Sequence, residues 1–398
     1  MSASWRAALS HHSIVTQAAW GGIRLIIGYR ALTQGAEPLQ LGLLASSFAL
    51  PALLFALTAG RIADRWGGSR VFLCGSLTAA AGTTTALATE GLPLLLIASA
   101  IIGLGNLMVM VGEQAFVAHI SKGKSPESAF GILTAAGSVG QMIGPPAVTF
   151  IATTTSGGRT DTNLGLLACL GFNALAIPCY FLLRRTDAQM RSARGQVASR
   201  ANIAGILKAP GLWRSLVVSG AVLVTVDLMF VFVPVWASEQ QVSAAVVGLL
   251  LALRAGVSVI SRLGLTRLIN RFGRKAILMA SIGAAVVSLI VLPLVGPLPA
   301  FAVMIGMGLG IGIPQPLTMA WVVSLTAAAN HGAVLGLRMT VNRLAQISLP
   351  VAVGALAAPL GVLGIFWANA AILAGAIAIV AGSDGGQSKQ INPDSQED

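Results

Sequence analysis

Charged residues are scarce in this sequence. Asp, Glu, Lys and Arg make up 10% of its 398 residues, whereas a soluble domain carries about 25%. Acidic residues are fewest, with 13 against 25 basic ones, while 55% of the chain is hydrophobic. So little polar surface excludes a water-soluble domain, a collagen-like chain and a disordered chain. The long apolar runs instead predict a polytopic membrane protein.

Cysteine and histidine are also few. Cys74, Cys169 and Cys179 lie within apolar stretches and lack the spacing of a metal site or a disulfide framework. The four histidines form no cluster in the sequence. We therefore expect no metal site and no cofactor. No recurring set of nucleophile, base and orienting residue indicates an enzyme.

Twelve apolar runs approach the length of about 20 residues that a helix needs to cross a bilayer. The first run is too long and too charged to be a cleavable signal peptide. The runs cover residues 12–34, 39–60, 70–89, 92–118, 129–152, 163–184, 214–237, 244–265, 276–294, 298–326, 333–356 and 360–381. This pattern predicts an all-α membrane protein.

One long polar connector divides the runs into two sets of six. We expect an N-terminal six-helix bundle at 1–184, a cytoplasmic linker at 185–213 and a C-terminal six-helix bundle at 214–381. Residues 382–398 are polar and predict a disordered cytoplasmic tail.

Basic residues follow an asymmetric pattern along the connectors. Most of the 25 Lys and Arg residues lie on the side of the N-terminus, and the connectors on the other side contain Arg159. The positive-inside rule then places both termini in the cytoplasm. The same distribution argues against nucleic acid as a partner. We expect a monomer in a bacterial inner (plasma) membrane.

A short motif recurs after the second and eighth runs. Its two copies contain Gly60, Asp64, Arg65 and Gly67, then Asn270, Arg271, Gly273 and Arg274. Arg65 and Arg271 are 206 residues apart, and Pro145 and Pro350 are 205 apart. Two landmarks at nearly one spacing predict two duplicated, pseudo-symmetric halves, the organisation of many secondary transporters.

This motif resembles the signature of the major facilitator superfamily, G-x-[L/I]-A-D-R-x-G. The matching residues are Gly60, Ile62, Ala63, Asp64, Arg65 and Gly67. The resemblance implies a twelve-helix transporter that works by alternating access, in which this loop latches the two halves in the outward-facing state. Gly60 would allow close helix approach, and Asp64 would lie against a helix N-terminus.

A second motif lies in the fifth run. Gly131, Gly140, Gly144 and Pro145 match G-x8-G-x3-G-P, which resembles the antiporter motif of the superfamily's drug/proton branch. The resemblance implies a smooth helix face packed tightly against the partner half. Ordinary packing of small residues is the alternative. Ser99 stands where that branch often has an arginine.

Two charged residues lie near the middle of adjacent runs. Asp227 and Arg254 are 13 and 14 residues from the turn near residue 240, so they lie at nearly equal depth. An ionisable group at mid-membrane costs at least about 2.5 kcal/mol and is a functional candidate. We predict that the two form a proton-coupling pair. A static pair that joins two helices is the alternative.

Polar residues in four further runs are candidate substrate ligands. They are Arg24, Asn106, Glu113, Gln315 and Arg343. The resemblance implies that helices one, four, seven and ten line the central cavity. We expect Arg30 to extend toward the outer interface instead.

The balance of charge inside the runs bears on the cargo. Five arginines, counting Arg338, lie in the runs against Asp227 and Glu113. Proton-coupled efflux of a drug-like or metabolite molecule is the leading interpretation. Uptake or exchange of an organic anion is the alternative that this charge excess favours, and a transport-inactive scaffold or sensor is a third. The expected partners are the lipid bilayer, a small-molecule substrate and protons.

Overall fold

The computed structural model describes residues 2–88, 90–120, 126–154, 160–191, 209–325, 331–357 and 361–382. Every regular element in these ranges is a helix, which confirms the predicted all-α class. Most of the expected linker and tail, residues 192–208 and 383–398, lies outside the described part of the chain.

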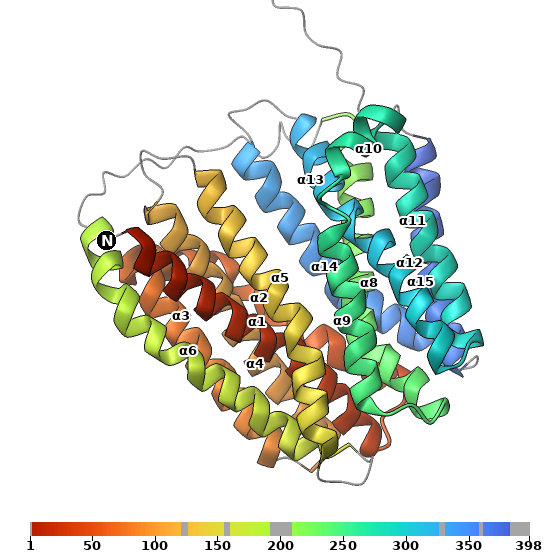
Figure 1. Ribbon diagram of the computed structural model, residues 1–398, viewed down its shortest axis with the longest axis horizontal. Helices are drawn as coiled ribbons and strands as arrows, with labels where there is room; N and C mark the ends of the chain where they lie inside the picture. Colours follow the sequence, from red (N-terminus) through yellow and green to blue (C-terminus); the bar gives the residue numbers. More distant parts are fainter. Residues whose placement is uncertain are drawn as a thin grey trace, which may run out of the picture.

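The first group of helices lies on one side of the molecule (Figure 1). It comprises α1 (Ser2–Thr33), α2 (Pro38–Trp66), α3 (Gly68–Ala88), α4 (Leu92–Ile120), α5 (Pro126–Thr154) and α6 (Thr162–Arg191). Helix α6 continues past residue 184, so the first seven residues of the expected linker are helical.

The second group lies beside the first. It comprises α8 (Leu212–Glu239), α9 (Ala244–Ile260), α10 (Leu265–Phe272), α11 (Arg274–Val291), the 3-10 turn η1 (Leu292–Leu294), α12 (Pro297–Gly312), α13 (Pro314–Ser324), α14 (His331–Ala357) and α15 (Gly361–Ala381). The tenth predicted run is divided between α12 and α13, because Pro314 cannot continue the preceding helix.

The helices match the lengths that a bilayer requires. Within the described residues, eight spans are long and apolar enough to cross a membrane, and α9 is an apolar helix of 17 residues. Helix α8 is the most deeply buried of these spans. It packs against α1 of the first group and against α14 and α15 of its own.

The two motif loops repeat in backbone geometry as well as in sequence. Gly67 has φ 94° and ψ 149°, and Gly273 has φ 80° and ψ 152°. Each donates its backbone N–H to a carbonyl four residues earlier, at Ala63 and Ile269. This φ favours glycine, which explains the residue type in both copies.

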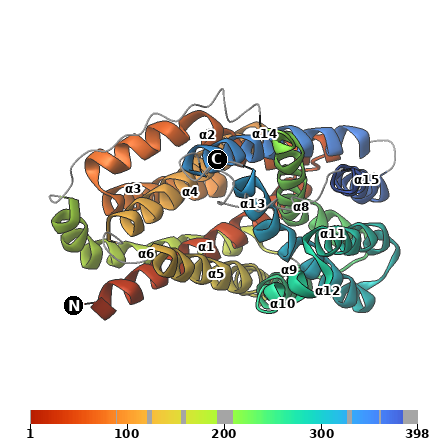
Figure 2. The ribbon, with the colours of Figure 1, turned by 90° about the horizontal axis from the view of Figure 1, so that it is seen from above.

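The two groups meet mainly along two helix pairs, α2 with α14 and α5 with α9 (Figure 2). A side chain at Gly42 would collide with the carbonyl oxygen of Pro350. One at Gly248 would lie 2.9 Å from the carbonyl oxygen of Pro145. Gly42 and Gly248 are 206 residues apart and the two prolines 205 apart. Duplication of one six-helix half would produce this correspondence.

These contacts lie near one end of the molecule, at the starts of α2 and α9 and in the last third of α5 and α14. The motif loops lie at the opposite end. There, no atom lies within 4 Å of a Cβ placed on Gly60. The close helix approach expected at Gly60 is therefore absent in this conformation, because the halves are apart at that end. The Asp64 side chain lies outside the described part.

Candidate functional site

An ion pair joins the two groups of helices at their centre. Arg24 of α1 places Nη1 2.8 Å from Oδ1 of Asp227 on α8. Its Nη2 also donates to the backbone oxygen of Asp227 over 3.2 Å. The side chains of Arg24 and Asp227 are 6% and 15% exposed, so the pair is largely shielded from solvent, which strengthens its electrostatic attraction.

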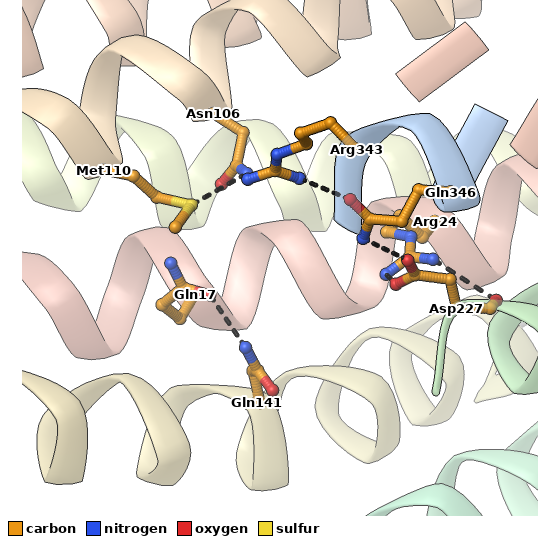
Figure 3. Close-up of polar contacts among 8 residues, drawn as sticks. All are labelled: Gln17, Arg24, Asn106, Met110, Gln141, Asp227, Arg343 and Gln346. Atoms are coloured by element: carbon orange, nitrogen blue, oxygen red, sulfur yellow. Dashed lines mark hydrogen bonds and ion pairs between the residues drawn. The ribbon is translucent and has the colours of Figure 1, made fainter. Parts of the chain in front are cut away.

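The second oxygen of Asp227 is bound from a third helix (Figure 3). Gln346 of α14 donates through Nε2 to Oδ2 of Asp227. Its Oε1 accepts from Nη1 of Arg343, one turn earlier, over 2.8 Å. Arg24, Asp227, Gln346 and Arg343 therefore form one network, which we name the central cluster.

Aromatic rings hold the Arg24 side chain in place. Its guanidinium carbon lies 5.3 Å from the ring centre of Trp20 and 4.8 Å from that of Phe230. A cation within about 6 Å of a ring face is attracted to it. Trp20 lies on the same helix as Arg24, and Phe230 lies one turn beyond Asp227, so both helices position the cation.

The predicted pair of Asp227 with Arg254 is not the pair that forms. Asp227 binds Arg24 and Gln346 instead. Equal depth does not set direction around a helix axis, and Asp227 faces α1 and α14 rather than α9. Arg254 is 4% exposed and lies 5.8 Å from the Phe230 ring centre. Among the described residues, its nitrogens have no hydrogen-bond partner.

Glu113 is not open to a substrate in this conformation. Its Oε1 lies 2.7 Å from Nδ1 of His12, and the two residues are 3% and 1% exposed. The His12 ring also contacts the Phe72 ring in a tilted arrangement, with ring centres 4.2 Å apart. His12 is not among the predicted site residues, because no local pattern in the sequence connects it with Glu113, 101 positions away.

Asn106 lies inside the first group of helices. It lines a cavity with Thr16, Trp20 and Asn173. Its Nδ2 lies 3.7 Å from the sulfur of Met110, one turn away (Figure 3). Asn106 and Glu113 therefore lie in the region of α4 that faces α1, rather than joining the central cluster.

Gln315 lines a second hollow, between the two groups. This cleft, with room of about 60 Å³, is also lined by Gln141 of α5, Arg254 of α9 and Arg262. The Oε1 of Gln315 accepts from Nη2 of Arg262 over 2.9 Å. The structure thus brings Gln315 together with Arg254 and separates both from the ion pair.

The glycine motif of α5 packs within its own half. Side chains at Gly140 and Gly144 would collide with the backbone of α1, at Ile14 and Ala18. The expected contact with the partner half is made instead by the segment that begins at Pro145, which faces Gly248. Gly140 and Gly144 face α1, whereas the residues of α5 from Pro145 onward contact α9. The surroundings of Gly131 lie outside the described part.

Arg30 reaches the end of the bundle that holds the α3–α4 and α5–α6 connectors, which is the side expected for it. It donates to Oδ1 of Asn163 over 2.6 Å and to the carbonyl oxygen of Leu87 over 3.0 Å. The residue is 9% exposed. Polar groups at the ends of α3 and α6 give this arginine partners inside the bundle.

Comparison with known proteins identifies the fold. A family model described as Major Facilitator Superfamily matches residues 13–348, with a second match over 228–393. No curated protein sequence matches the chain. The drug/proton antiporter branch finds no support in the comparisons.

Solved transporters share this architecture over nearly their whole length. The nucleoside transporter NupG has a TM-score of 0.79 at 15% identity, covering 96% of this chain and 99% of its own. A bacterial homologue of the human lysosomal transporter Spinster has a TM-score of 0.71 at 14% identity, covering 94% of each chain. A POT family transporter with a bound thioalcohol-conjugated peptide has a TM-score of 0.72 at 14% identity, covering 94% of each chain.

Proposed function

The chain belongs to the major facilitator superfamily, and on that premise we propose that it moves a small organic anion or zwitterion together with protons. It is an integral membrane protein and a secondary transporter of small solutes, not an enzyme. The cargo and the coupling are our proposal. The observation that carries it is the ion pair between Arg24 and Asp227, which connects the two groups of helices.

The ion pair lies where alternating access must act on it. Arg24 belongs to the first group and Asp227 to the second, so a relative rotation of the groups strains or breaks their contact. Removing one partner of a buried pair costs about 3–5 kcal/mol, because the other charge stays buried alone. A proton or an anion that compensates the separated charges therefore lowers the barrier to the movement.

The pair also links a proton to an anion. A proton on Asp227 cancels the charge that holds Arg24. An anion on Arg24 in turn leaves Asp227 without its cation and favours the protonated carboxyl group. Each ligand thus promotes binding of the other, and such coupling is reciprocal. Binding in the same state predicts transport in the same direction, which is symport.

Charge around the cluster favours an anionic group on the cargo. Arg24 binds Asp227, Arg343 joins the same network through Gln346, and Arg254 lies against the Phe230 ring that also contacts Arg24. One carboxylate leaves the region with excess positive charge. A lipophilic cation would be repelled there, whereas a carboxylate or phosphate would be attracted.

We propose that the conformation is open toward the cytoplasm. The start of α1, the end of α15 and the basic motif loops at 61–70 and 262–275 lie at the end where the halves are apart, and the positive-inside rule assigns that end to the cytoplasm. The loop with Asp64 and Arg65 would then engage when this end closes, in the outward-facing state.

Proton-coupled efflux of a drug-like molecule is the second candidate. The sequence of Gly131, Gly140, Gly144 and Pro145 favours it. Against it, Gly140 and Gly144 pack on α1 of their own half, where they do not seal the interface with the partner half. Protection of expressing cells from cationic drugs, without accumulation of organic acids, would favour this candidate.

Flux in proteoliposomes tests the proposal. Under an imposed proton gradient, we expect a labelled carboxylate or zwitterion to accumulate on the side to which protons flow, while a lipophilic cation does not. Asp227→Asn should reduce this flux by about a hundredfold, the equivalent of about 3 kcal/mol. Asp161→Asn is the matched control, because Asn can still cap α6. Undiminished gradient-driven flux in Asp227→Asn would refute the coupling role.

A further inference from the structure

The cleft beside Arg254 has the composition of an anion site. It lies between α5 of the first group and α9, α12 and α13 of the second. Arginine, glutamine and serine side chains line it together with apolar residues, and no Asp or Glu is among them. A polar hollow with cations and no carboxylate favours negatively charged ligands.

Among the described residues, Arg254 is a buried cation without a hydrogen-bond or ion-pair partner. Three arginines of the described residues are less than a tenth exposed: Arg24, Arg30 and Arg254. Arg24 binds a carboxylate, and Arg30 binds oxygens of α3 and α6. The nitrogens of Arg254 have no hydrogen-bond partner in the described part of the chain. A buried charge in this state is costly unless a ligand or water compensates it.

Neighbouring groups present donors to the same cleft. Because Oε1 of Gln315 accepts from Arg262, the Nε2 hydrogens of Gln315 remain available. Arg262 is held by the carbonyl oxygen of Gly312 through Nε, over 3.2 Å. Gln141 contributes a second amide and is itself held by Gln17 over 3.1 Å (Figure 3). These positions are therefore fixed before a ligand arrives.

We propose that this cleft is the loading subsite for the anionic group, a carboxylate or phosphate, of the transported solute. Arg254 and Arg262 supply the charge, and Gln315 and Gln141 supply hydrogen bonds. This inference rests on the proposed function. It adds that the anion binds first at Arg254, while Asp227 still occupies Arg24.

The position of Phe230 connects the subsite to the central cluster. Its ring lies against both Arg24 and Arg254. An anion at Arg254 therefore has a second cation beyond the same ring, which becomes free when Asp227 takes up a proton. The solute would move from the cleft toward the ion pair as the halves rearrange.

Anion binding to the purified protein tests the subsite. The probes are inorganic phosphate and acetate, each against chloride at equal ionic strength, measured as stabilisation against thermal unfolding. We expect phosphate or acetate to stabilise the wild type and Asp227→Asn. Arg254→Gln should raise the dissociation constant by about tenfold or more, since a charge-assisted hydrogen-bond donor is lost. Arg267→Gln, which removes an exposed cation beyond the cleft, should bind as the wild type does.

A conservative variant distinguishes loss of charge at Arg254 from loss of hydrogen-bond geometry. Arg254→Lys retains the charge and loses the planar fork, so its binding should fall between wild type and Arg254→Gln. Equal binding by wild type and Arg254→Gln would overturn the proposal, as would absence of stabilisation by both anions. Stabilisation by phosphatidylglycerol but not by free anions would assign the cleft to a lipid headgroup and overturn the loading role.

Flux measurements separate this inference from the proposed function. If the wild type moves organic anions with protons while Arg254→Gln binds anions normally, the loading subsite is wrong and the transport proposal stands. If binding depends on Arg254 but the wild type moves no organic anion, the subsite stands and the transport proposal is wrong.

Discussion

Two carboxylate contacts of similar length occupy different kinds of position in this protein. Arg24 and Asp227 lie 2.8 Å apart and connect α1 of one group to α8 of the other. His12 and Glu113 lie 2.7 Å apart and connect α1 to α4 within one group. When the groups rotate as units, the first pair must open, and the second moves with its group unchanged.

We therefore expect the first contact to act in transport coupling and the second in the stability of the N-terminal group. Both pairs place charge or polarity inside an apolar bundle, where an unmatched partner is costly. The cost appears during the transport cycle for Arg24 and Asp227, because the movement itself separates them. For His12 and Glu113 it appears when the N-terminal group unfolds. A variant of each pair should therefore change a different measured quantity.

The largest effect is expected from altering the contact of Gly248 with Pro145 and Pro146, which joins the two halves. Gly248→Ala would place a Cβ 2.8 Å from Cα of Pro146 and 2.9 Å from the oxygen of Pro145. Overpacking of this kind costs about 1–3 kcal/mol, so the population of this conformation should fall by about fivefold to a hundredfold. Gly171→Ala, with no neighbour within 4 Å, is the control.

Distances between spin labels report this shift. Leu182 and Leu263 are 67% and 84% exposed, lie on different groups near the open end, and can carry labels in a background without the native cysteines. Gly248→Ala should shorten the distance between them, because opening one end closes the other. An unchanged distance distribution would show that the halves do not rotate as units.

Glu113→Gln tests the contact between His12 and Glu113, which lies within one group of helices. It removes the charge next to His12 within one group, so we expect a loss of stability of about 1–3 kcal/mol, seen as a lower apparent unfolding temperature. Gradient-driven flux per folded molecule should stay within about twofold of wild type. A large loss of flux at unchanged unfolding temperature would place this pair in the transport cycle instead.

The smallest expected effect concerns a hydrogen bond across the interface. Ser46 donates to the carbonyl oxygen of Ile347 over 2.6 Å, from α2 to α14. Ser46→Ala should weaken this conformation by about 1 kcal/mol, a shift of about fivefold in the label-distance populations. Ser47→Ala is the matched control, since Ser47 bonds within its own helix. Equal behaviour of the two variants would mean that this bond does not discriminate between conformations.

The sequence predicts the helices better than the contacts between them. Hydrophobic run length, proline positions and the spacing of repeated motifs are local features, and they led to the all-helical fold and to the glycines at 67 and 273. Depth also follows from counting residues, which placed Asp227 correctly near mid-helix. Direction around the helix axis does not follow from that count, since it depends on which neighbours pack there.

The residues that were misassigned show this limit. Asp227 turns toward α1 rather than α9, so it binds Arg24 and not Arg254. Glu113 meets His12, a residue 101 positions away whose partner no local pattern indicates. The packing of the bundle determines the long-range partners of polar side chains. A single sequence does not show that packing.

The central claim is that protonation of Asp227 releases Arg24 and allows the halves to exchange conformations. The distance between labels at Leu182 and Leu263, measured across a range of pH, tests it without knowledge of the cargo. We predict that the wild type shifts to shorter distances as the pH falls, because the ion pair that holds this conformation is lost. Asp227→Asn should show the shorter distances at every pH. If Asp227→Asn kept the longer distances, or shifted with pH as the wild type does, the claim would be contradicted.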